Sequence, residues 1–269
     1  MKIPKERPWS AAVRAAIATQ KTLAESFRDT GFPQSVRYIG GADIAFAKAT
    51  DGTRTGSVGC DAIGIAIIYD LVDQRLIDAA YIRAKIDFPY VPGLLSFREA
   101  PILEAAIAQL RHPADAWMFD GQGRSHPRGV GLATHMGIRL EMPSIGAAKS
   151  VLLGRYDMPA PLQKEIVRRQ ASKAPSKFKS RLTFPLTAPL LHNEIEIARA
   201  LWMTPRTEPM IISQGHRCTL DQALATTIAA TRPGHWMPEP TRLADELTKR
   251  TRDLPEAEAR TLVLAQIPT

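Results

Sequence analysis

Two acidic residues stand where a carboxylate is unexpected, and their chemistry points to a metal ion. Asp43 lies within the apolar run of residues 36–47, where a buried carboxylate needs a hydrogen bond, an ionic partner or a metal. Asp120 ends the apolar segment AWMFD, and Gly121 allows the chain to turn sharply after it. Strand carboxyl ends are where open α/β sheets bind ligands. For each acid alone, a solvent-facing or loop-capping position is the alternative.

Glu99 is a third candidate acid. It follows Ser96 by three residues, which is the spacing of a helix capping box, but Pro101 would remove an early hydrogen bond from such a helix. Three acids on separate elements around one sheet suit Mg²⁺, which prefers carboxylate oxygens and completes its shell with water and phosphate. Such an ion can activate water and neutralise charge on a phosphodiester. The cluster therefore indicates phosphodiester hydrolysis.

Two basic side chains could assist this chemistry. Lys149 follows the short apolar segment PSIG and could stabilise a phosphate or a departing oxygen; an exposed helical lysine is the alternative. His216 precedes an expected helix and could orient water, bind metal or move a proton. A packed or solvated loop histidine is the alternative there.

Composition and missing motifs exclude several classes of protein. The 269 residues are 45% hydrophobic and 23% charged, which is ordinary for a globular domain. The longest apolar run has eight residues, whereas a membrane span needs about 20. No secretory signal is visible, and two cysteines form no disulfide framework, so we expect a cytoplasmic protein without a membrane partner. Walker A, H-E-x-x-H and G-x-S-x-G motifs are absent.

The elements that must position these residues follow from the hydrophobic pattern. We expect an N-terminal helix over residues 9–29, then strands over 36–47, 61–71 and 75–85, the last two forming a hairpin. An ordered loop over residues 87–97 should precede a helix with one face formed by Leu103, Ile107 and Leu110. Later segments alternate between strand and helix, with strands at 116–120 and 209–213 and a capping box at Thr219 and Gln222. The pattern predicts one α/β domain.

A basic excess favours a polyanionic partner. Thirty-five Lys and Arg residues against 27 Asp and Glu give 35 − 27 = +8, with a pI near 9.7. Between residues 164 and 181 the only acid is Glu165, and this basic segment should be a partly helical surface insertion within about residues 156–190. It could add phosphate contacts, although a solvated loop is the alternative. Its basic residues are Lys164, Arg168, Arg169, Lys173, Lys177, Lys179 and Arg181.

Five blocks of the sequence resemble motifs of the endonuclease V family and keep the family's order. Residues 88–99, FPYVPGLLSFRE, resemble the twelve-position signature F-P-Y-x-P-G-x-L-x-F-R-E at all nine residues that it specifies. The other blocks are DGQGRSHPR at 120–128, GAAK at 146–149, SQGHR at 213–217 and PEPTRLAD at 238–245. Together they span roughly residues 35–250, so the resemblance covers most of the chain.

The resemblance implies an RNase H-like fold, in which a mixed sheet of three antiparallel strands followed by parallel strands is flanked by helices. It also implies a DNA repair endonuclease that requires Mg²⁺, with Mn²⁺ as a substitute. Such an enzyme nicks DNA on the 3′ side of deoxyinosine and other deaminated bases, one nucleotide beyond the lesion, leaving 3′-hydroxyl and 5′-phosphate ends. The alternatives are an inosine-specific endoribonuclease and a lesion-binding protein with weak catalysis. We expect a monomer.

Carried over to this sequence, the resemblance assigns roles to the five candidate residues. Asp43 and Asp120 would hold the metal, and Glu99 would complete the cluster directly or through water. Lys149 would contact the phosphate or position the nucleophile, and His216 would assist at the metal and the attacking water.

The resemblance also implies a group of substrate contacts. Tyr90 would be a wedge pressed into the base stack, in a loop that Pro89 and Pro92 stiffen. Unstacking a base costs least at a mispaired position, which gives selectivity for damage. The glycines at 121, 123, 129 and 131 would let the backbone approach the extruded base. The remaining expected substrate contacts are Gly121, Gly123, His126 and Arg128.

Two positions depart from the family pattern. Gln122 stands where the family often has His, and Gln214 where it often has Pro. Gln122 leaves the acid and the glycines intact, so it bears on rate, metal preference or base preference.

Overall fold

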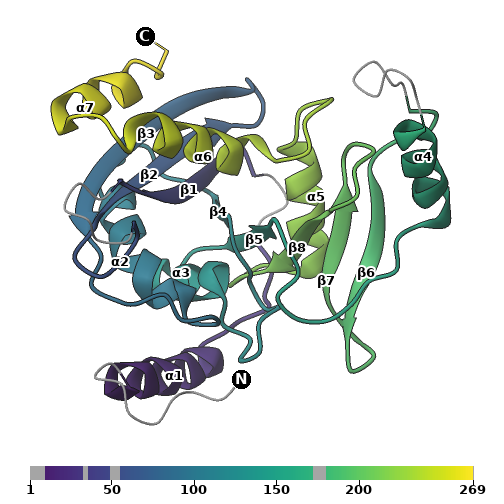
Figure 1. Cartoon of the computed structure of the whole chain (residues 1–269), viewed down its shortest axis with the longest axis horizontal. Coiled ribbons are helices and arrows are strands. Elements are labelled where there is room, and N and C mark those ends of the chain that lie inside the picture. The colour runs from purple at the N-terminus through teal and green to yellow at the C-terminus, as the bar shows by residue number, and fades with distance from the viewer. Residues whose placement is uncertain (1–9, 33–35, 49–54, 172–179, 269) are drawn as a thin grey trace.

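A computed structural model describes residues 10–32, 36–48, 55–171 and 180–268, which form one mixed sheet flanked by helices (Figure 1). The sheet has the strand order β3-β2-β1-β4-β5-β8-β7-β6. Its strands are β1 Tyr38–Phe46, β2 Asp61–Asp70, β3 Arg75–Lys85, β4 Ala116–Phe119, β5 Ser144–Ala148, β6 Leu186–His192, β7 Ile195–Trp202 and β8 Met210–Gln214. The helices are α1 Ser10–Glu25, α2 Leu95–Ile107, α3 Leu132–Leu140, α4 Ala160–Gln170, α5 Leu220–Ala229, α6 Glu239–Thr251 and α7 Glu256–Leu264.

The first half of the sheet follows the prediction. Strands β1, β2 and β3 form an antiparallel meander, and β4 and β5 extend it in parallel with β1. Every residue of β2 after Asp61 is buried, as its nearly continuous apolar run requires, because helices cover both faces. The structure confirms the expected mixed α/β fold.

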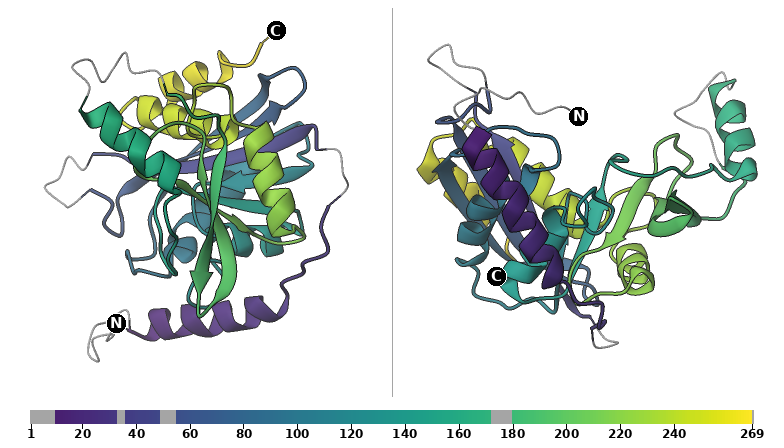
Figure 2. Two further views of the ribbon diagram at one scale, coloured as in Figure 1. Left: turned by 90° about the vertical axis from the view of Figure 1, so that its right-hand side faces the viewer. Right: turned by 90° about the horizontal axis from the view of Figure 1, so that it is seen from below.

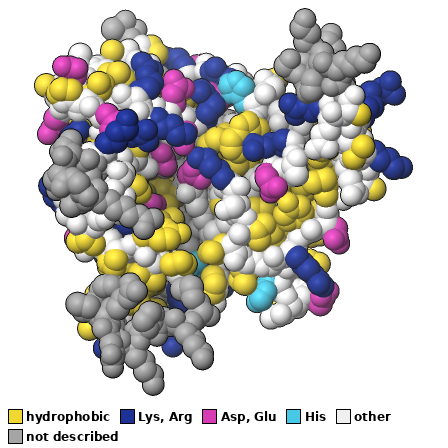
Figure 3. Space-filling view, viewed as in Figure 1, with side chains coloured by type: hydrophobic (Ala, Val, Ile, Leu, Met, Phe, Trp, Pro, Cys, Tyr) yellow, Lys and Arg dark blue, Asp and Glu magenta, His cyan; other side chains and the backbone are white. Residues whose placement is uncertain are grey.

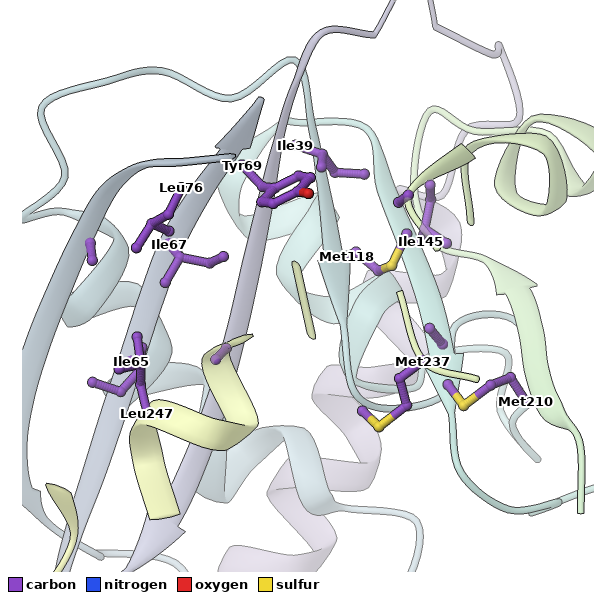
Figure 4. Packing of buried hydrophobic residues seen from close by; sticks show 14 of the residues in the cluster. Ile39, Ile65, Ile67, Tyr69, Leu76, Met118, Ile145, Met210, Met237 and Leu247 are labelled. Carbon is purple, nitrogen blue, oxygen red and sulfur yellow. The ribbon is translucent and has the colours of Figure 1, made fainter. Parts of the chain in front are cut away.

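Helices divide between the two faces of the sheet, and this division decides which side chains meet. On one face, Ile39, Met118 and Ile145 pack with residues of α5, α6 and α7 (Figure 4). On the other face, Trp117 and Phe119 pack with residues of α2 and α3. Side chains alternate along a strand, so odd-numbered positions of β1 and even-numbered positions of β4 face α6. Asp43 and Asp120 therefore belong to the same face.

The second half of the sheet contains a hairpin that the sequence analysis missed. Strands β6 and β7 pair antiparallel and join the sheet through β8, with β6 at the free edge. Helix α4 packs on this hairpin through Leu162, so α4, β6 and β7 form an arm that extends from the body, as Figure 2 shows. The expected basic insertion is helical over α4, but its second boundary near residue 190 falls inside β6. Residues 172–179 lie outside the described residues.

The structure decides the capping alternative at Ser96 and corrects the expected extent of α2. The residue before the helix is Leu94, without a side-chain cap, and the hydroxyl of Ser96 instead lies 2.8 Å from Nδ1 of His135. The Ser96–Glu99 pair is therefore no capping box. The helix ends at Ile107, so Leu110 packs on the same core from the following turn.

The capping box at Thr219 and Gln222 is present at the start of α5, which confirms that prediction. Helix α1 ends at Glu25, four residues before the expected boundary. None of the helices in the described part of the chain is long and apolar enough to cross a membrane.

Candidate active site: an acidic cluster beside an apolar pocket

Asp43 and Asp120 are brought together by strand pairing. Strands β1 and β4 are parallel, and their register ends at the pair Ala42 and Phe119, so Asp43 and Asp120 are the next residues on neighbouring strands. Neighbouring strands lie about 4.8 Å apart. Both carboxylates therefore stand side by side at the edge where β4 ends.

Glu99 reaches the same cluster from α2, and its pKa records this proximity. Burial raises the pKa of Glu99 to about 8, and the carboxylates of Asp43 and Asp120 add to the effect. Burial likewise raises the pKa of Asp43 to about 7, with Asp120 as the next cause, while a hydrogen bond from Thr248 acts in the opposite direction. The three predicted acids thus interact with one another.

Lys149 supplies the compensating charge. It follows β5 on the α6-facing side, and its Nζ lies 2.5 Å from Asp120 and 2.9 Å from Asp245. Burial lowers the pKa of Lys149, but the two ion pairs outweigh it and raise the pKa overall. The pKa of Asp120 is still raised, mainly by burial. Lys149 therefore stays protonated between two carboxylates.

Helix α6 contributes two residues that the sequence analysis did not assign. Asp245 pairs with Lys149, and the Thr248 hydroxyl donates a 2.9 Å hydrogen bond to Asp43. The helix can approach this closely because β1 carries Gly41, where a Cβ atom would lie 2.2 Å from the carbonyl oxygen of Pro240. The available signal was the block PEPTRLAD, which ends at Asp245 just after the buried Ala244. Thr248 follows Asp245 by about one helical turn, so the two side chains lie on the same side of the helix.

His216 does not join the cluster. It follows β8, which runs antiparallel to β5, so the chain has returned to the beginning of β5, where the Ser144 N–H donates to the His216 carbonyl oxygen. Lys149 follows the opposite end of this strand, about 16 Å further along by strand rise. The imidazole is buried, and its Nδ1 accepts a 3.3 Å hydrogen bond from the Arg28 N–H. The structure therefore corrects the expectation that His216 assists at the metal.

The donor set of the cluster fits a hard divalent cation. Among the described ranges, no group of three or more Asp, Glu, His or Cys side chains is close enough to cage an ion as it stands. Lys149 occupies Asp120 and Asp245, and Thr248 occupies one oxygen of Asp43. Mg²⁺ needs only one or two carboxylates beside water and phosphate, and a cation would relieve the repulsion that raises the pKa values of the acids.

A pocket of about 280 Å³ opens beside the cluster. Asp120 and Lys149 line it on the side of the acids, and Tyr90, Gly121 and His126 are among the residues that line the rest. Apolar surface predominates in it, as expected of a site that encloses a flat organic group. The pocket therefore places a potential base site next to the potential site of hydrolysis.

Tyr90 is the exposed tip of a well-anchored loop. Its relative exposure is 69%, whereas the neighbouring Val91 and Leu94 are buried against Val13 and Ala16 of α1. An exposed aromatic ring on an anchored loop is the geometry expected of a wedge. The prolines 89 and 92 flank its tip, as the sequence analysis anticipated.

The glycine-rich segment after β4 packs tightly against the sheet. A Cβ atom on Gly123 would lie 2.1 Å from the carbonyl oxygen of Gln214, and one on Gly121 would lie 3.1 Å from Leu132. Gln122 is buried and donates to the carbonyl oxygen of Ser150 at 2.7 Å. Gln122, which stands where the family often has His, thus connects this segment to the loop that follows Lys149.

His126 lines the pocket and Arg128 follows it by two residues, but both side chains contact the protein. Both reach the carbonyl oxygen of Gly93, in the loop that carries Tyr90. Their expected contact with substrate stays a prediction.

Several proteins that are similar to this chain in sequence and in fold belong to one family. The sequence model of the endonuclease V family matches residues 20–246. An endonuclease V from Gloeobacter violaceus is 35% identical over 247 residues, which covers 91% of this chain and 88% of that protein. The crystal structure of endonuclease V from Streptomyces avermitilis is similar with a TM-score of 0.71 and 33% identity, over 92% of this chain and 95% of that one.

A more distant structure contains nucleic acid. The Ciona intestinalis endonuclease V, at 20% identity and a TM-score of 0.65, covers 90% of this chain and 98% of its own. It was crystallised with a 24mer DNA that contains an inosine followed by a ribo-adenosine.

Proposed function

Since the chain belongs to the endonuclease V family of phosphodiester-hydrolysing nucleases, we propose that it is a DNA repair endonuclease directed at deoxyinosine and other deaminated bases. The nick would fall on the 3′ side of the lesion, one nucleotide beyond it, and leave 3′-hydroxyl and 5′-phosphate ends. The observation that carries this proposal is the acidic cluster of Asp43, Glu99 and Asp120 directly beside the apolar pocket.

The cluster supports hydrolysis of a phosphodiester. Asp43 and Asp120 would hold Mg²⁺, or Mn²⁺ in its place, with Glu99 joining directly or through water. When bound, the cation supplies Lewis acidity for activating water and neutralising charge on the phosphate. Lys149 lies 2.5 Å from Asp120 and carries a positive charge, so it would contact a phosphate that enters the cluster.

The pocket and Tyr90 support selectivity for a damaged base. A base that leaves the DNA double helix could enter the pocket while the exposed Tyr90 ring fills the space that the base leaves in the stack. Unstacking costs a few kcal/mol and least where pairing is already weak, as at a deaminated base. The inosine-containing DNA bound by the Ciona intestinalis protein agrees with this class of substrate.

A cleavage assay with matched strands tests the proposal. The substrate is a 5′-labelled duplex with one deoxyinosine, with an undamaged duplex and a matching inosine-containing RNA strand beside it. We expect a single nick on the DNA in Mg²⁺ or Mn²⁺, none in EDTA, and at least a 10³-fold lower rate for Asp43→Asn and Asp120→Asn.

Asp157→Asn, an exposed acid before α4, is the matched control. Faster cleavage of the RNA strand would identify a ribonuclease, since the 2′-hydroxyl is the only difference in the backbone. Tight binding of the lesion without cleavage in either metal would identify a lesion-binding protein.

A further inference from the structure

Three side chains converge on a single backbone carbonyl, that of Gly93. Gln20 Nε2 lies 3.0 Å from the Gly93 oxygen, Arg128 Nη2 lies 2.7 Å from it, and His126 Nε2 lies 3.0 Å from it. Gln20 belongs to α1, whereas the other two belong to the segment between β4 and α3. A carbonyl oxygen has two lone pairs, so three partners on one oxygen are unusual.

Gln20 is the centre of this arrangement. Its side chain is 1% exposed, and its second N–H donates to the Val130 carbonyl oxygen at 2.9 Å. Its Oε1 accepts a hydrogen bond from Arg128 Nε. One amide group therefore ties together α1, the Tyr90 loop and the segment before α3, with both of its hydrogens and its oxygen in use.

The tautomer of His126 follows from its second contact. Nδ1 of His126 accepts a 3.2 Å hydrogen bond from the Arg128 backbone N–H, so the ring proton must be on Nε2, which donates to Gly93. Burial, followed by the charge of Arg128, lowers the pKa of His126 to about 4, so the ring is neutral at physiological pH. All three side chains can thus donate to the same oxygen.

Gly93 is the point at which the Tyr90 loop changes direction. Its φ of +78° is left-handed, and it stands three residues after Tyr90. The Leu94 N–H donates to the Val91 carbonyl oxygen at 2.9 Å, which closes the turn around it. A clamp on Gly93 therefore fixes the base of the loop and leaves the Tyr90 ring free in solvent.

We propose that Gln20 is a positioning residue for lesion recognition, which acts with His126 and Arg128 by holding the Tyr90 loop in the conformation that enters the base stack. This inference rests on the proposed function. Ordering a loop during binding costs free energy for each residue that becomes fixed, so a loop already held in place enters DNA at lower cost. Gln20 lies on a helix outside all five motif blocks.

A double-mutant cycle separates positioning from a general structural role. Gln20→Ala should lower kcat/KM for inosine DNA at least tenfold in the otherwise intact protein, mainly through KM. In the Tyr90→Ala background the same change should cost less than twofold, because the loop then has no wedge to position. Gln20→Glu keeps the acceptor for Arg128 but loses both N–H donors, so it should resemble Gln20→Ala.

The matched control is Gln109→Ala, an exposed glutamine after α2, which should leave all parameters within twofold. Equal losses from Gln20→Ala in both backgrounds would overturn the proposal, since they would indicate a role independent of Tyr90.

Amide hydrogen exchange provides a readout that needs no substrate. Gln20→Ala should speed exchange at least tenfold in the peptide covering residues 88–95, while the strands of the sheet keep their protection. Unchanged exchange in this peptide would refute the clamp. Faster exchange in a protein without inosine cleavage would refute the proposed function and keep the clamp.

Discussion

The most informative residues of this protein are buried carboxylates whose negative charge is only partly balanced by nearby cations. Asp43, Glu99 and Asp120 meet in one place, and among the described residues Lys149 forms an ion pair with one of them, Asp120. The raised pKa values of the acids mean that the folded protein holds their protons more tightly than the unfolded chain does. Folding therefore works against the charge state that binds a cation, as expected where function and stability compete.

Replacement of Glu99 by glutamine should stabilise the metal-free protein at high pH. The pKa of Glu99 is raised from 4.5 to about 8, so its contribution to stability is fully present below pH 4.5 and is lost as the pH rises through 8. Relative to the wild type, Glu99→Gln should gain about 1–3 kcal/mol in the free energy of unfolding between pH 5 and 8.5. Urea titrations in EDTA measure this difference.

Glu258→Gln, on the exposed surface of α7, is the control for the change of charge. A stability difference that does not vary with pH would contradict the assignment of Glu99 to a repulsive cluster.

His216→Ala should affect stability more than catalysis. The imidazole is buried and accepts a backbone hydrogen bond from Arg28, so its loss should lower the free energy of unfolding by about 1–3 kcal/mol. We expect kcat on inosine DNA to stay within about threefold, whereas Asp245→Asn should lower it about 100-fold or more. A large loss of kcat with unchanged stability would restore the catalytic role first predicted for His216.

At the scale of elements, the loop before α2 holds the proposed recognition residue, Tyr90, apart from the proposed catalytic acids. Val91 and Leu94 anchor it on α1, while Tyr90 is 69% exposed at its tip and the acids belong to β1, the end of β4 and α2. Substitutions at the tip and at the cluster should therefore have different kinetic effects.

Tyr90→Ala should weaken discrimination between inosine and undamaged DNA. The wedge provides stacking worth about 1–3 kcal/mol per base, so the ratio of kcat/KM values should fall about 10–100-fold. The acidic cluster is untouched, so phosphodiester hydrolysis should persist. Tyr90→Phe, which keeps the ring, is the matched control, and equal discrimination by Tyr90→Ala would refute the wedge.

The sequence predicted the strands that have a continuous apolar run and missed those whose strand pattern is interrupted by a proline or an atypical turn. Continuous apolar runs identified β2 and β3, but the β6–β7 hairpin contains Pro189 and a turn at Asn193 and Glu194. Both turn residues have positive φ, 50° and 62°, a conformation for which Asn-Gly is the usual sequence. Because a glutamate occupies the second position, the sequence does not show the usual hairpin-turn motif.

Part of the candidate site could be predicted from the same local hydrophobic pattern. Asp43 and Asp120 could be recognised because each interrupts or ends an apolar strand. The position of His216 depended on the direction of β8, which local pattern does not determine. Asp245 depended on the docking of α6 across β1, which requires the close approach at Gly41.

At the scale of the whole molecule, basic side chains spread beyond the cluster. Figure 3 shows Lys and Arg side chains on the arm and on the adjacent body. On α4, Arg168 pairs with Glu165, while Lys164 is exposed at the far end of the arm. A nucleic acid that extends from the pocket toward the arm would meet positive charge.

Replacing basic residues of the arm should change the salt dependence of DNA binding. Lys164→Ala combined with Arg181→Ala should reduce the slope of log K against log salt by about 1–2, because each phosphate contact contributes about 0.9. Affinity should fall equally for inosine and undamaged duplexes. Arg260→Ala on α7 is the control, and an unchanged slope would favour the solvated-loop alternative for this segment.

The free edge formed by β6 also has a consequence for self-association. An exposed edge strand is a template on which a strand of another copy could add. Pro189 lacks an N–H, and the N–H and carbonyl of Leu191 are already bonded to Arg155, so this edge offers a broken row of donors and acceptors. The arm can therefore extend into solvent at high protein concentration while resisting the edge-to-edge growth that leads to aggregation.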